Sequence, residues 1–281
     1  MHNYKPVAEN NLERFDNTEL ARANMFDDAL IVISNLIARA STKWTIEETK
    51  LFLCAVSKVK TRDESNWVHL QKRDIAEKLG IDPTNRPKMR DMFKRMVMKS
   101  YIQIDGKLDE AKDDEIEYLD GVLLTSLKST KKTISVQFNE TYMPLLDQLS
   151  SHFTEFYLDY VKDFKRVSSY KLYVYLCSWA NHNYQDQEKK IAKKDIQKVF
   201  GLKEGEYWRD YGTDKARFHW TDFEKRCLNP AIEEINSLTS CDMHILSCDK
   251  VRHQKKDGTY SREILGYDIW YTFVDEDGFR K

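Results

Sequence analysis

One short segment occurs twice in this chain of 281 residues, and this repetition constrains the fold more than any other feature. RDIAEKLGI (73–81) is followed 121 positions later by KDIQKVFGL (194–202), which keeps a basic residue, Asp-Ile, a large apolar residue and Gly-apolar in the same order. The segments upstream also correspond, since ETKLFLCAV (48–56) precedes the first copy and SYKLYVYLC (169–177) the second. A repeat with matching flanks indicates an internal duplication, so we expect two copies of one domain.

Each copy of the segment has the pattern of a helix that ends in a tight turn. Asp74 and Asp195 are residues of a type that caps helix N-termini, and Gly80 and Gly201 supply the left-handed residue at which a helix ends. Apolar residues at four-residue spacing place one face of each helix against a core: Ile75 and Leu79 in the first copy, and Ile196 and Phe200 in the second. This pattern is typical of the second helix and turn of a helix-turn-helix motif.

A further helical pattern follows each turn and is the candidate recognition helix. Its apolar stripe consists of Met89, Phe93, Met96 and Val97 in the first copy, and of Trp220, Phe223, Cys227, Leu228, Ile232 and Ile235 in the second. The basic residues that lie off these stripes, and are therefore expected to face outward, are Lys94 with Arg95 and Lys225 with Arg226.

The pattern then changes from helical to alternating. YIQID (101–105) and ISVQF (134–138) follow the first helix, and CDMHILS (241–247) and LGYDIWYTF (265–273) follow the second, all with the alternation of half-buried strands. Helix, helix-turn-helix and β-hairpin is the order of a winged helix. We therefore predict an α+β, helix-rich fold of two tandem winged-helix domains related by internal duplication: a flexible N-terminal arm (1–28), domain 1 (29–150), domain 2 (151–275) and a C-terminal tail (276–281).

Composition limits the class of protein further. The 45 Lys and Arg nearly balance the 46 Asp and Glu, so a nucleic-acid surface must come from local clusters of charge. No apolar run approaches 18 residues, and the N-terminus lacks the apolar core of a signal peptide, so we expect a cytoplasmic protein without a membrane partner. Five cysteines without framework spacing fit free thiols in a reducing compartment.

The sequence contains no motif for catalysis or for a cofactor. It has no P-loop, and no His-x-His pair of the kind that a rolling-circle nicking enzyme would need beside the tyrosines of residues 170–175. Cys241, His244, Cys248 and His253 have spacing that suggests zinc, but strand alternation directs His244 and Cys248 away from the face of Cys241. We expect no enzyme activity, no catalytic residue, no metal and no cofactor.

Several segments resemble one known family, the plasmid replication initiators that bind iterons. The most specific is DFEKRCLNPAIEEIN (222–236), which follows the family's pattern Asp-Phe-x-x-Arg-x-Leu-x-Pro-Ala-Ile-x-Glu-Ile-Asn. Other segments similar to this family are SNLIARASTKWTIEETKLFL (34–53), YKLYVYLCSW (170–179) and YDIWYTF (267–273). Two residues depart from the usual pattern: Gln197 replaces a small residue of the helix-turn-helix, and Cys227 replaces an apolar residue.

The resemblance implies a function and a set of partners. Members of this family bind direct repeats in double-stranded DNA at a plasmid origin, open the duplex nearby and recruit host replication proteins. They also repress their own gene by binding an operator inverted repeat as a dimer. The resemblance further implies that the first domain forms the dimer interface and that the protein exchanges between monomer and dimer.

The two expected wings differ in charge. DKVRHQKKDGTYSR (249–262) gathers basic residues at the tip of the second wing, where a wing would lie along phosphates. KLDEAKDDE (107–115) gives the first wing an acidic tip that DNA would repel, although KSTKK (128–132) offers basic residues nearby. We therefore expect domain 2 to read the base sequence and domain 1 to contact the DNA backbone.

Individual candidate residues follow from these positions. At 100° per residue, Arg226 projects about 300° around the helix from Phe223, so it leaves the core stripe and can reach a base edge, where arginine reads guanine. Lysines on a wing would meet phosphate, which is the same at every base pair. The full set of candidate DNA-binding residues is Lys215, Arg217, Thr221, Lys225, Arg226, Asn229, Lys250, Arg252, Lys255, Lys256, Lys94, Arg95, Lys131 and Lys132.

Two other functions use the same modules. A tandem winged-helix transcription regulator without a replication role needs the same DNA-binding surfaces, and a protein-only adaptor would use winged helices for docking. DNA context distinguishes the first of these, because an initiator is expected beside several direct repeats and an A+T-rich stretch, and a repressor beside one palindrome. The adaptor predicts no salt-sensitive DNA binding.

Overall fold

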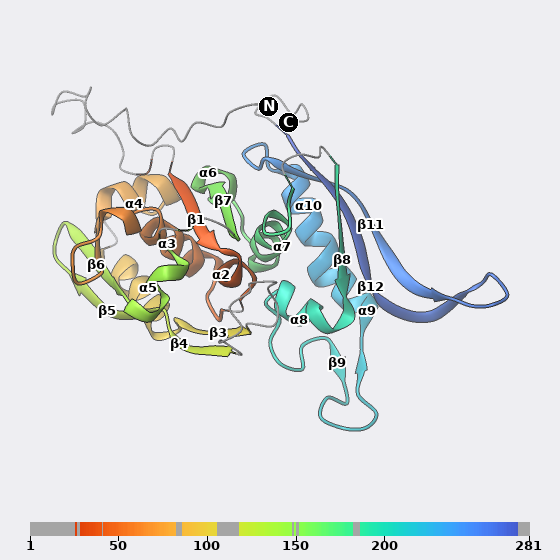
Figure 1. The fold of residues 1–281 in the computed structure, drawn as a ribbon. Helices are drawn as coiled ribbons and strands as arrows, with labels where there is room; N and C mark the ends of the chain where they lie inside the picture. Colours follow the sequence, from red (N-terminus) through yellow and green to blue (C-terminus); the bar gives the residue numbers. More distant parts are fainter. Residues whose placement is uncertain are drawn as a thin grey trace.

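The computed structural model describes residues 26, 29–40, 42–82, 86–105, 118–147, 149, 152–181 and 186–274. The expected tail and almost all of the expected N-terminal arm lie outside this part of the chain. Figure 1 shows two halves side by side, the first in red to green and the second in teal to blue. Helix α7 (Val167–Cys177) of the second half lies next to the first half, and a long hairpin of β11 (Met243–Gln254) and β12 (Tyr260–Phe273) projects from the second half.

The first half is a winged helix with one additional hairpin. A three-stranded sheet of order β2-β6-β5 carries the wing, and β3 and β4 form a separate two-stranded sheet. The elements are β1 (Leu30–Ser34), α2 (Asn35–Arg39), α3 (Ile46–Val56), the 3-10 helix Val59–Thr61, β2 (Trp67–Gln71), α4 (Lys72–Leu79), α5 (Arg86–Met98), β3 (Tyr101–Asp105), β4 (Tyr118–Val122), β5 (Leu124–Ser129), β6 (Thr133–Phe138) and the 3-10 helix Glu140–Leu145.

The second half repeats the winged-helix order, without a counterpart of the β3–β4 hairpin and with a short hairpin inserted between its second and third helices. Its sheet order, β11-β12-β8, matches β5-β6-β2, so both halves place the wing hairpin against the strand that precedes the helix-turn-helix. The elements are β7 (Phe153–Tyr157), α6 (Leu158–Val161), α7, β8 (Asp186–Ala192), the 3-10 helix Lys193–Asp195, α8 (Ile196–Val199), β9 (Trp208–Arg209), β10 (Arg217–Phe218), α9 (Trp220–Phe223), the π-helix Glu224–Leu228, α10 (Asn229–Ser237), β11 and β12. The predicted tandem winged helices are confirmed, with substantial strand beside the helix.

The turn that ends the second helix of each motif has the same geometry in both copies. Gly80 and Gly201 have φ angles of 61° and 64°, which is the left-handed conformation that the sequence predicts. The residue after each glycine donates an equivalent backbone hydrogen bond: Ile81 to the carbonyl of Ala76 at 2.8 Å, and Leu202 to that of Gln197 at 2.9 Å. The duplication therefore extends to single hydrogen bonds.

The starts of these helices differ from the prediction. α4 follows β2 directly at Gln71, which makes no side-chain cap, and Asp74 is buried in the first turn of the helix. Asp195 ends a 3-10 helix, and its side chain caps nothing. The predicted capping by Asp74 and Asp195 is therefore wrong, because a strand that runs straight into a helix leaves no loop residue to act as a cap.

The first wing is also not the segment that the sequence suggests. β6 pairs with both β5 and β2, so the β5–β6 hairpin occupies the place of the β11–β12 hairpin in the second half. Its turn contains Lys131 and Lys132, both exposed. The acidic segment 107–115 lies outside the described residues and connects β3 to β4. The acidic first wing is a wrong prediction, because pairing with β2, and not order along the chain, decides which hairpin is the wing.

The two halves are joined by the strands with which they begin. β1 pairs antiparallel with β7, from Leu30 opposite Tyr157 to Ser34 opposite Phe153. Each of these strands is the first element of its half. Their antiparallel pairing therefore relates the two halves locally by a two-fold rotation. One apolar core continues through both halves. The domain boundary near residues 150 and 151 remains a prediction. β7, which follows this boundary in the chain, pairs with β1 of the first half.

Candidate nucleic-acid interface

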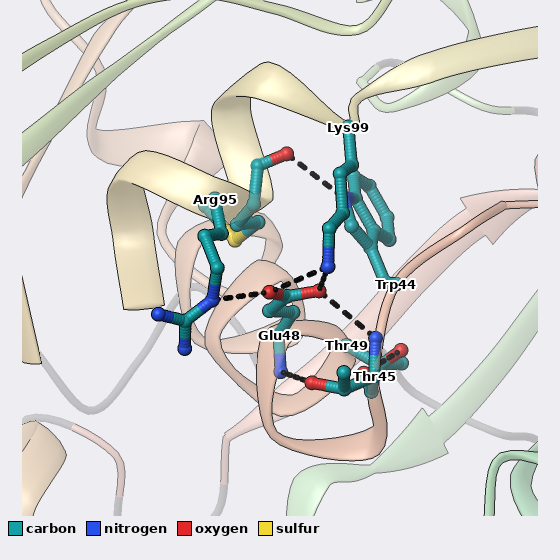
Figure 2. Close-up of polar contacts among 7 residues, drawn as sticks. Trp44, Thr45, Glu48, Thr49, Arg95 and Lys99 are labelled. Atoms are coloured by element: carbon teal, nitrogen blue, oxygen red, sulfur yellow. Dashed lines mark hydrogen bonds and ion pairs between the residues drawn. The ribbon is translucent and has the colours of Figure 1, made fainter. Parts of the chain in front are cut away.

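The first recognition helix, α5, is held at its C-terminal end by a buried carboxylate (Figure 2). Glu48 near the N-terminus of α3 is fully buried, and it accepts hydrogen bonds from Arg95 Nε at 3.0 Å and Lys99 Nζ at 2.9 Å. It also forms a capping box with Thr45. Burial opposes ionisation, but the backbone N–H of Thr45 and the two cations hold the pKa of Glu48 below its ordinary value. The position of α5 on α3 is therefore fixed.

α5 presents its polar face outward. Met89, Phe93 and Met96 are buried, as the stripe predicts, and Lys94 is exposed. Arg95 has a half-exposed side chain, but its Nε is bonded to the carboxylate beneath it. The outward orientation predicted for Lys94 is thus confirmed, whereas Arg95 also serves to hold the helix in place.

The first wing has a basic tip that is tied to the start of α4. Lys72 is buried, and its Nζ donates to Ser129 Oγ at 2.9 Å and to the carbonyl of Thr130 at 2.6 Å. The backbone N–H of Lys72 bonds the carbonyl of Lys132 at 2.9 Å. These bonds hold the exposed side chains of Lys131 and Lys132 beside the helix-turn-helix, where a wing meets phosphate.

The second recognition helix contains a wide turn. It passes from α9 through the π-helix Glu224–Leu228 to α10, and Phe223, Cys227 and Leu228 are buried as predicted. A π turn bonds residues five apart, so it holds more residues per turn than an α-helix. The angle of about 300° for Arg226, which assumes 100° per residue, therefore does not apply across this turn.

Four candidate residues along this helix are nevertheless exposed. Thr221 lies in α9, Lys225 and Arg226 lie in the π turn, and Asn229 begins α10. Each can donate a hydrogen bond to a base edge or a phosphate. π turns occur frequently at functional sites, and here the turn lies in the part of the helix that carries the basic pair.

A carboxylate also ties the second recognition helix to its wing. Glu224 in the π turn accepts from Tyr267 Oη of β12 at 2.6 Å and forms an ion pair of 2.8 Å with Lys250 Nζ of β11. Burial, followed by the hydrogen bond to Glu224, raises the pKa of Tyr267. Lys250 was expected near the wing tip and lies instead at the base of the wing, where an intramolecular partner competes with DNA for its charge.

The tip of the second wing is a tight turn. Lys255 accepts a backbone hydrogen bond from Gly258, whose φ is 82°, and donates one to the carbonyl of Thr259 at 2.7 Å. Arg252, Lys255 and Lys256 are all exposed. The predicted basic tip before Asp257 and Gly258 is thus present in the hairpin that extends farthest from the core (Figure 1).

A short hairpin between α8 and α9 adds further basic residues. Arg217 of β10 lies directly opposite Arg209 of β9, and both are exposed, as is Lys215 in the connecting loop. The hairpin is anchored by Trp208, whose ring lies 5.5 Å from that of Phe218. Sequence reasoning missed Arg209. The signal that could have identified Arg209 is its position opposite Arg217 in the hairpin. Strands of two residues are too short to be predicted from the sequence.

Comparison with known proteins places the chain in a family. Residues 30–177 match the model of the initiator replication protein WH1 domain, and residues 192–267 match that of the initiator Rep protein WH2 domain. The chain belongs to the initiator replication protein family. The resemblance inferred from the sequence is therefore confirmed. No curated protein matches the chain by sequence.

The fold is similar to that of a solved initiator structure. The Pi initiator protein, in a crystal structure with iteron DNA, matches with a TM-score of 0.65 and 15% identity over 88% of this chain and 98% of that chain. Domains 2 and 3 of RctB match with a TM-score of 0.43 and 12% identity over 83% of this chain and 85% of that chain, too distant to define details. The match to the Pi initiator establishes the fold of both halves together.

Two expected absences concern metals and membranes. Within the described ranges, no group of three or more His, Cys, Asp and Glu side chains is placed to hold a metal ion. In the same part of the chain, no helix is long and apolar enough to cross a bilayer. The expected lack of a metal site and of enzyme activity, like the DNA-binding roles of the individual residues, remains a prediction.

Proposed function

We propose that this initiator binds direct repeats in double-stranded DNA at a plasmid origin and starts replication there. The observation that carries the proposal is that each half of one chain presents a recognition helix beside a wing with a basic tip. Two such modules on one chain can occupy major grooves one helical turn apart, about 34–36 Å along one face of the duplex. The Pi initiator, whose fold this chain shares, was crystallised with iteron DNA.

The two modules have different expected roles. In the second, Arg226 and Asn229 are exposed on the recognition helix and can read guanine and adenine. In the first, the candidates Lys94, Lys131 and Lys132 are exposed and suit phosphate. We assign sequence reading mainly to the second half and backbone contacts to the first. Because the first wing is the β5–β6 hairpin and not the acidic segment 107–115, the wings of both modules can approach DNA.

The remaining parts of the proposal concern partners and regulation. We propose that a dimer formed through the first half represses the initiator's own gene at an inverted repeat, and that the monomer occupies single direct repeats. Host replication proteins complete initiation, and the chain acts by binding and not as an enzyme. The support is family membership together with the β3–β4 sheet, which has no third strand among the described residues and so offers edges for pairing.

Binding to repeat DNA from beside its own gene tests the proposal. The affinity of the purified chain for the repeats should fall steeply between 50 and 200 mM salt, because clustered Lys and Arg displace condensed counterions; six to ten phosphate contacts correspond to a loss of about 10³–10⁵-fold. A scrambled duplex should bind with the affinity of random DNA. Equal affinity for both duplexes, a flat salt response, or preference for a single palindrome over direct repeats would each contradict it.

Sedimentation tests the dimer. The chain should shift between monomer and dimer with protein concentration, and an excess of single-repeat DNA should shift it toward monomer. A chain that stays monomeric at every concentration would remove autorepression by a dimer from the proposal and leave repeat binding intact.

A further inference from the structure

A cavity of about 450 Å³ lies at the junction of the two halves, and the proposed function leaves it unused. Its lining comes from Arg39 at the end of α2, from Tyr175 and Trp179 at the end of α7, and from β8, α8 and the base of the β11–β12 hairpin. The first half therefore contributes an arginine, and the second half contributes the remaining wall. The elements that carry these lining residues, among them α2, α7 and α8, are labelled in Figure 1.

Two cations lie against one indole ring beside this cavity. The Cζ of Arg39 is 3.7 Å and the Nζ of Lys189 is 3.1 Å from the ring centroid of Trp179. Two hydrogen bonds also hold the guanidinium. Arg39 Nε donates to Ser178 Oγ at 2.9 Å, and Arg39 Nη2 donates to the Ser178 carbonyl at 2.7 Å. Arg39 is thus held in place without any ligand.

The lining carries an excess of positive charge. Among the described residues that line it, four are cationic, Arg39, Lys189, Lys190 and Lys198, and the carboxylate is that of Asp195. Lys190 is paired with Glu188 of its own strand, β8, and with Asp268 of β12. Burial, and then the charge of Arg39, lowers the pKa of Lys189, while Asp195 opposes the shift. An anion in the cavity would relieve the repulsion between these cations.

The rest of the wall is apolar, and this limits the kind of anion. Tyr175, Ile191, Val199, Val251 and Leu265 line the cavity beside the charged groups. A volume of about 450 Å³ is far larger than an inorganic phosphate and falls within the roughly 300–1,000 Å³ of small-molecule sites. Arginine and lysine beside an apolar wall suit a ligand with a phosphate at one end and a flat ring at the other.

We propose that this cavity binds a mononucleotide, with its phosphate toward Arg39, Lys189 and Lys198 and its base along the apolar wall. Because Arg39 belongs to the first half and the lysines to the second, the ligand contacts both halves. Occupancy then restrains the placement of one winged helix relative to the other. This proposal does not depend on the proposed function, because it concerns a small molecule at a site that contains neither recognition helix.

Titration of the full chain with AMP, without DNA, tests the proposal. Binding is measured by calorimetry and by the fluorescence of Trp179, identified by subtracting the signal of a Trp179→Phe variant. We expect saturable binding of AMP, weaker binding of adenosine and weaker binding of inorganic phosphate. Lys189→Gln should weaken AMP binding at least tenfold.

A matched control is available in β5 of the first wing. Lys128 also lies on an indole, with its Nζ 4.0 Å from the ring of Trp67, but it is not part of the cavity. Lys128→Gln should bind AMP as the wild type does, and Lys198→Gln serves as a second cavity variant should Lys189→Gln fail to fold by circular dichroism.

Three outcomes would overturn the proposal. They are no saturable binding at millimolar AMP, equal loss of binding in Lys189→Gln and Lys128→Gln, and binding of inorganic phosphate as tight as that of AMP. A fourth arm uses a short oligo-dT strand. If this strand binds through Lys189 and AMP does not, the cavity receives single-stranded DNA and the mononucleotide assignment is wrong.

Discussion

The two winged helices share a fold and differ in how each holds its recognition helix. In the first half, the buried Glu48 bonds the end of α5 to α3. In the second, Glu224 lies within the recognition helix itself and bonds Lys250 and Tyr267 of the wing strands. The first module is therefore a helix fixed on a rigid base. The second couples helix and wing, so a DNA contact that moves one also affects the other.

A second comparison concerns equivalent lysines on α3 and α7. Lys50 and Lys171 occupy the same place in the two copies, 121 positions apart. Lys50 is half-buried among the carboxylates of Glu47, Asp163 and Glu234, whereas Lys171 is buried and donates to the carbonyl of Ala40 at 2.5 Å. The duplication preserved the residue. Burial lowers the pKa of both lysines, but carboxylates oppose the shift at Lys50, whereas the charge of Lys198 adds to it at Lys171.

The largest expected effect is that of Glu48→Gln. Breaking a buried ion pair costs about 3–5 kcal/mol, and we expect about 3–4 kcal/mol in the free energy of unfolding because Arg95 is half-exposed. Glu224→Gln, at a less buried site, should cost less than half as much. Urea unfolding of both variants provides the measurement, and equal costs would contradict the difference between the two modules.

The same variant has a defined pH dependence. Because the pKa of Glu48 is lowered from 4.5, its contribution is present above about pH 4.5 and is lost as pH falls through the folded pKa. Between pH 6 and 3 the wild type should therefore lose more stability than Glu48→Gln. Parallel curves for the two proteins in this range would contradict the assignment.

Lys171→Met is expected to have the next largest effect. Burial lowers the pKa of Lys171 from 10.5 to about 8, so folding disfavours its protonated form. Above pH 10.5 the lysine is neutral in both the folded and the unfolded chain, so its burial costs nothing through ionisation. As the pH falls from 10.5 toward 8, the free energy of unfolding decreases by about 3 kcal/mol, at 1.36 kcal/mol per pKa unit. The wild type, relative to Lys171→Met, should thus gain stability from pH 8 to 10.5. Lys50→Met is the matched control and should show a smaller change.

Arg226→Ala is expected to affect specificity more than stability. It should cost roughly 1–3 kcal/mol on the cognate repeat and little on random DNA, flattening the preference at one or two base pairs. Fluorescence anisotropy with single-base variants of the repeat provides the measurement, after circular dichroism has established folding. Equal weakening on all duplexes would make Arg226 a backbone contact, and Thr221, Lys225 and Asn229 would be the next candidates.

The smallest effects are expected at the two wing tips. Lys132→Ala in the first wing and Lys255→Ala in the second should weaken cognate and random DNA alike, and each should lower the salt slope by about one unit. A change in slope for Lys255→Ala alone would mean that only the second wing touches DNA. The two-wing arrangement would then be wrong.

Local patterns in the sequence predicted the parts of the fold that local contacts decide. The left-handed Gly80 and Gly201 and the buried stripe around Phe93 follow from spacing along one helix. The first wing was misplaced because an acidic hairpin follows α5 directly, while the pairing of β6 with β2 joins strands more than 60 residues apart. No pattern near residue 107 signals that pairing.

The candidate site could be predicted only in part. Exposure of Lys94 follows from helical periodicity and that of Lys255 from turn signals, and the structure agrees. Arg226 is also exposed, although the helical period used to predict this does not hold there. The π turn around Arg226 did not follow, because a 3.6-residue period was assumed throughout the helix. Lys250 was predicted to lie near the wing tip. The ion pair that holds it at the base of the wing could not be foreseen, because its partner, Glu224, lies 26 residues away in the chain. Contacts of this kind depend on tertiary packing.

The pairing of β1 with β7 also affects how the chain emerges from the ribosome. At about 5–20 residues per second, roughly 6–25 s separate the synthesis of Leu30 from that of Tyr157, its partner in the sheet. Until then, the apolar strand LIVIS has unpaired backbone groups along an edge that another nascent chain could occupy. A chain that stops soon after residue 150 keeps that edge permanently, so truncated products of this gene should aggregate where the full-length protein stays dispersed.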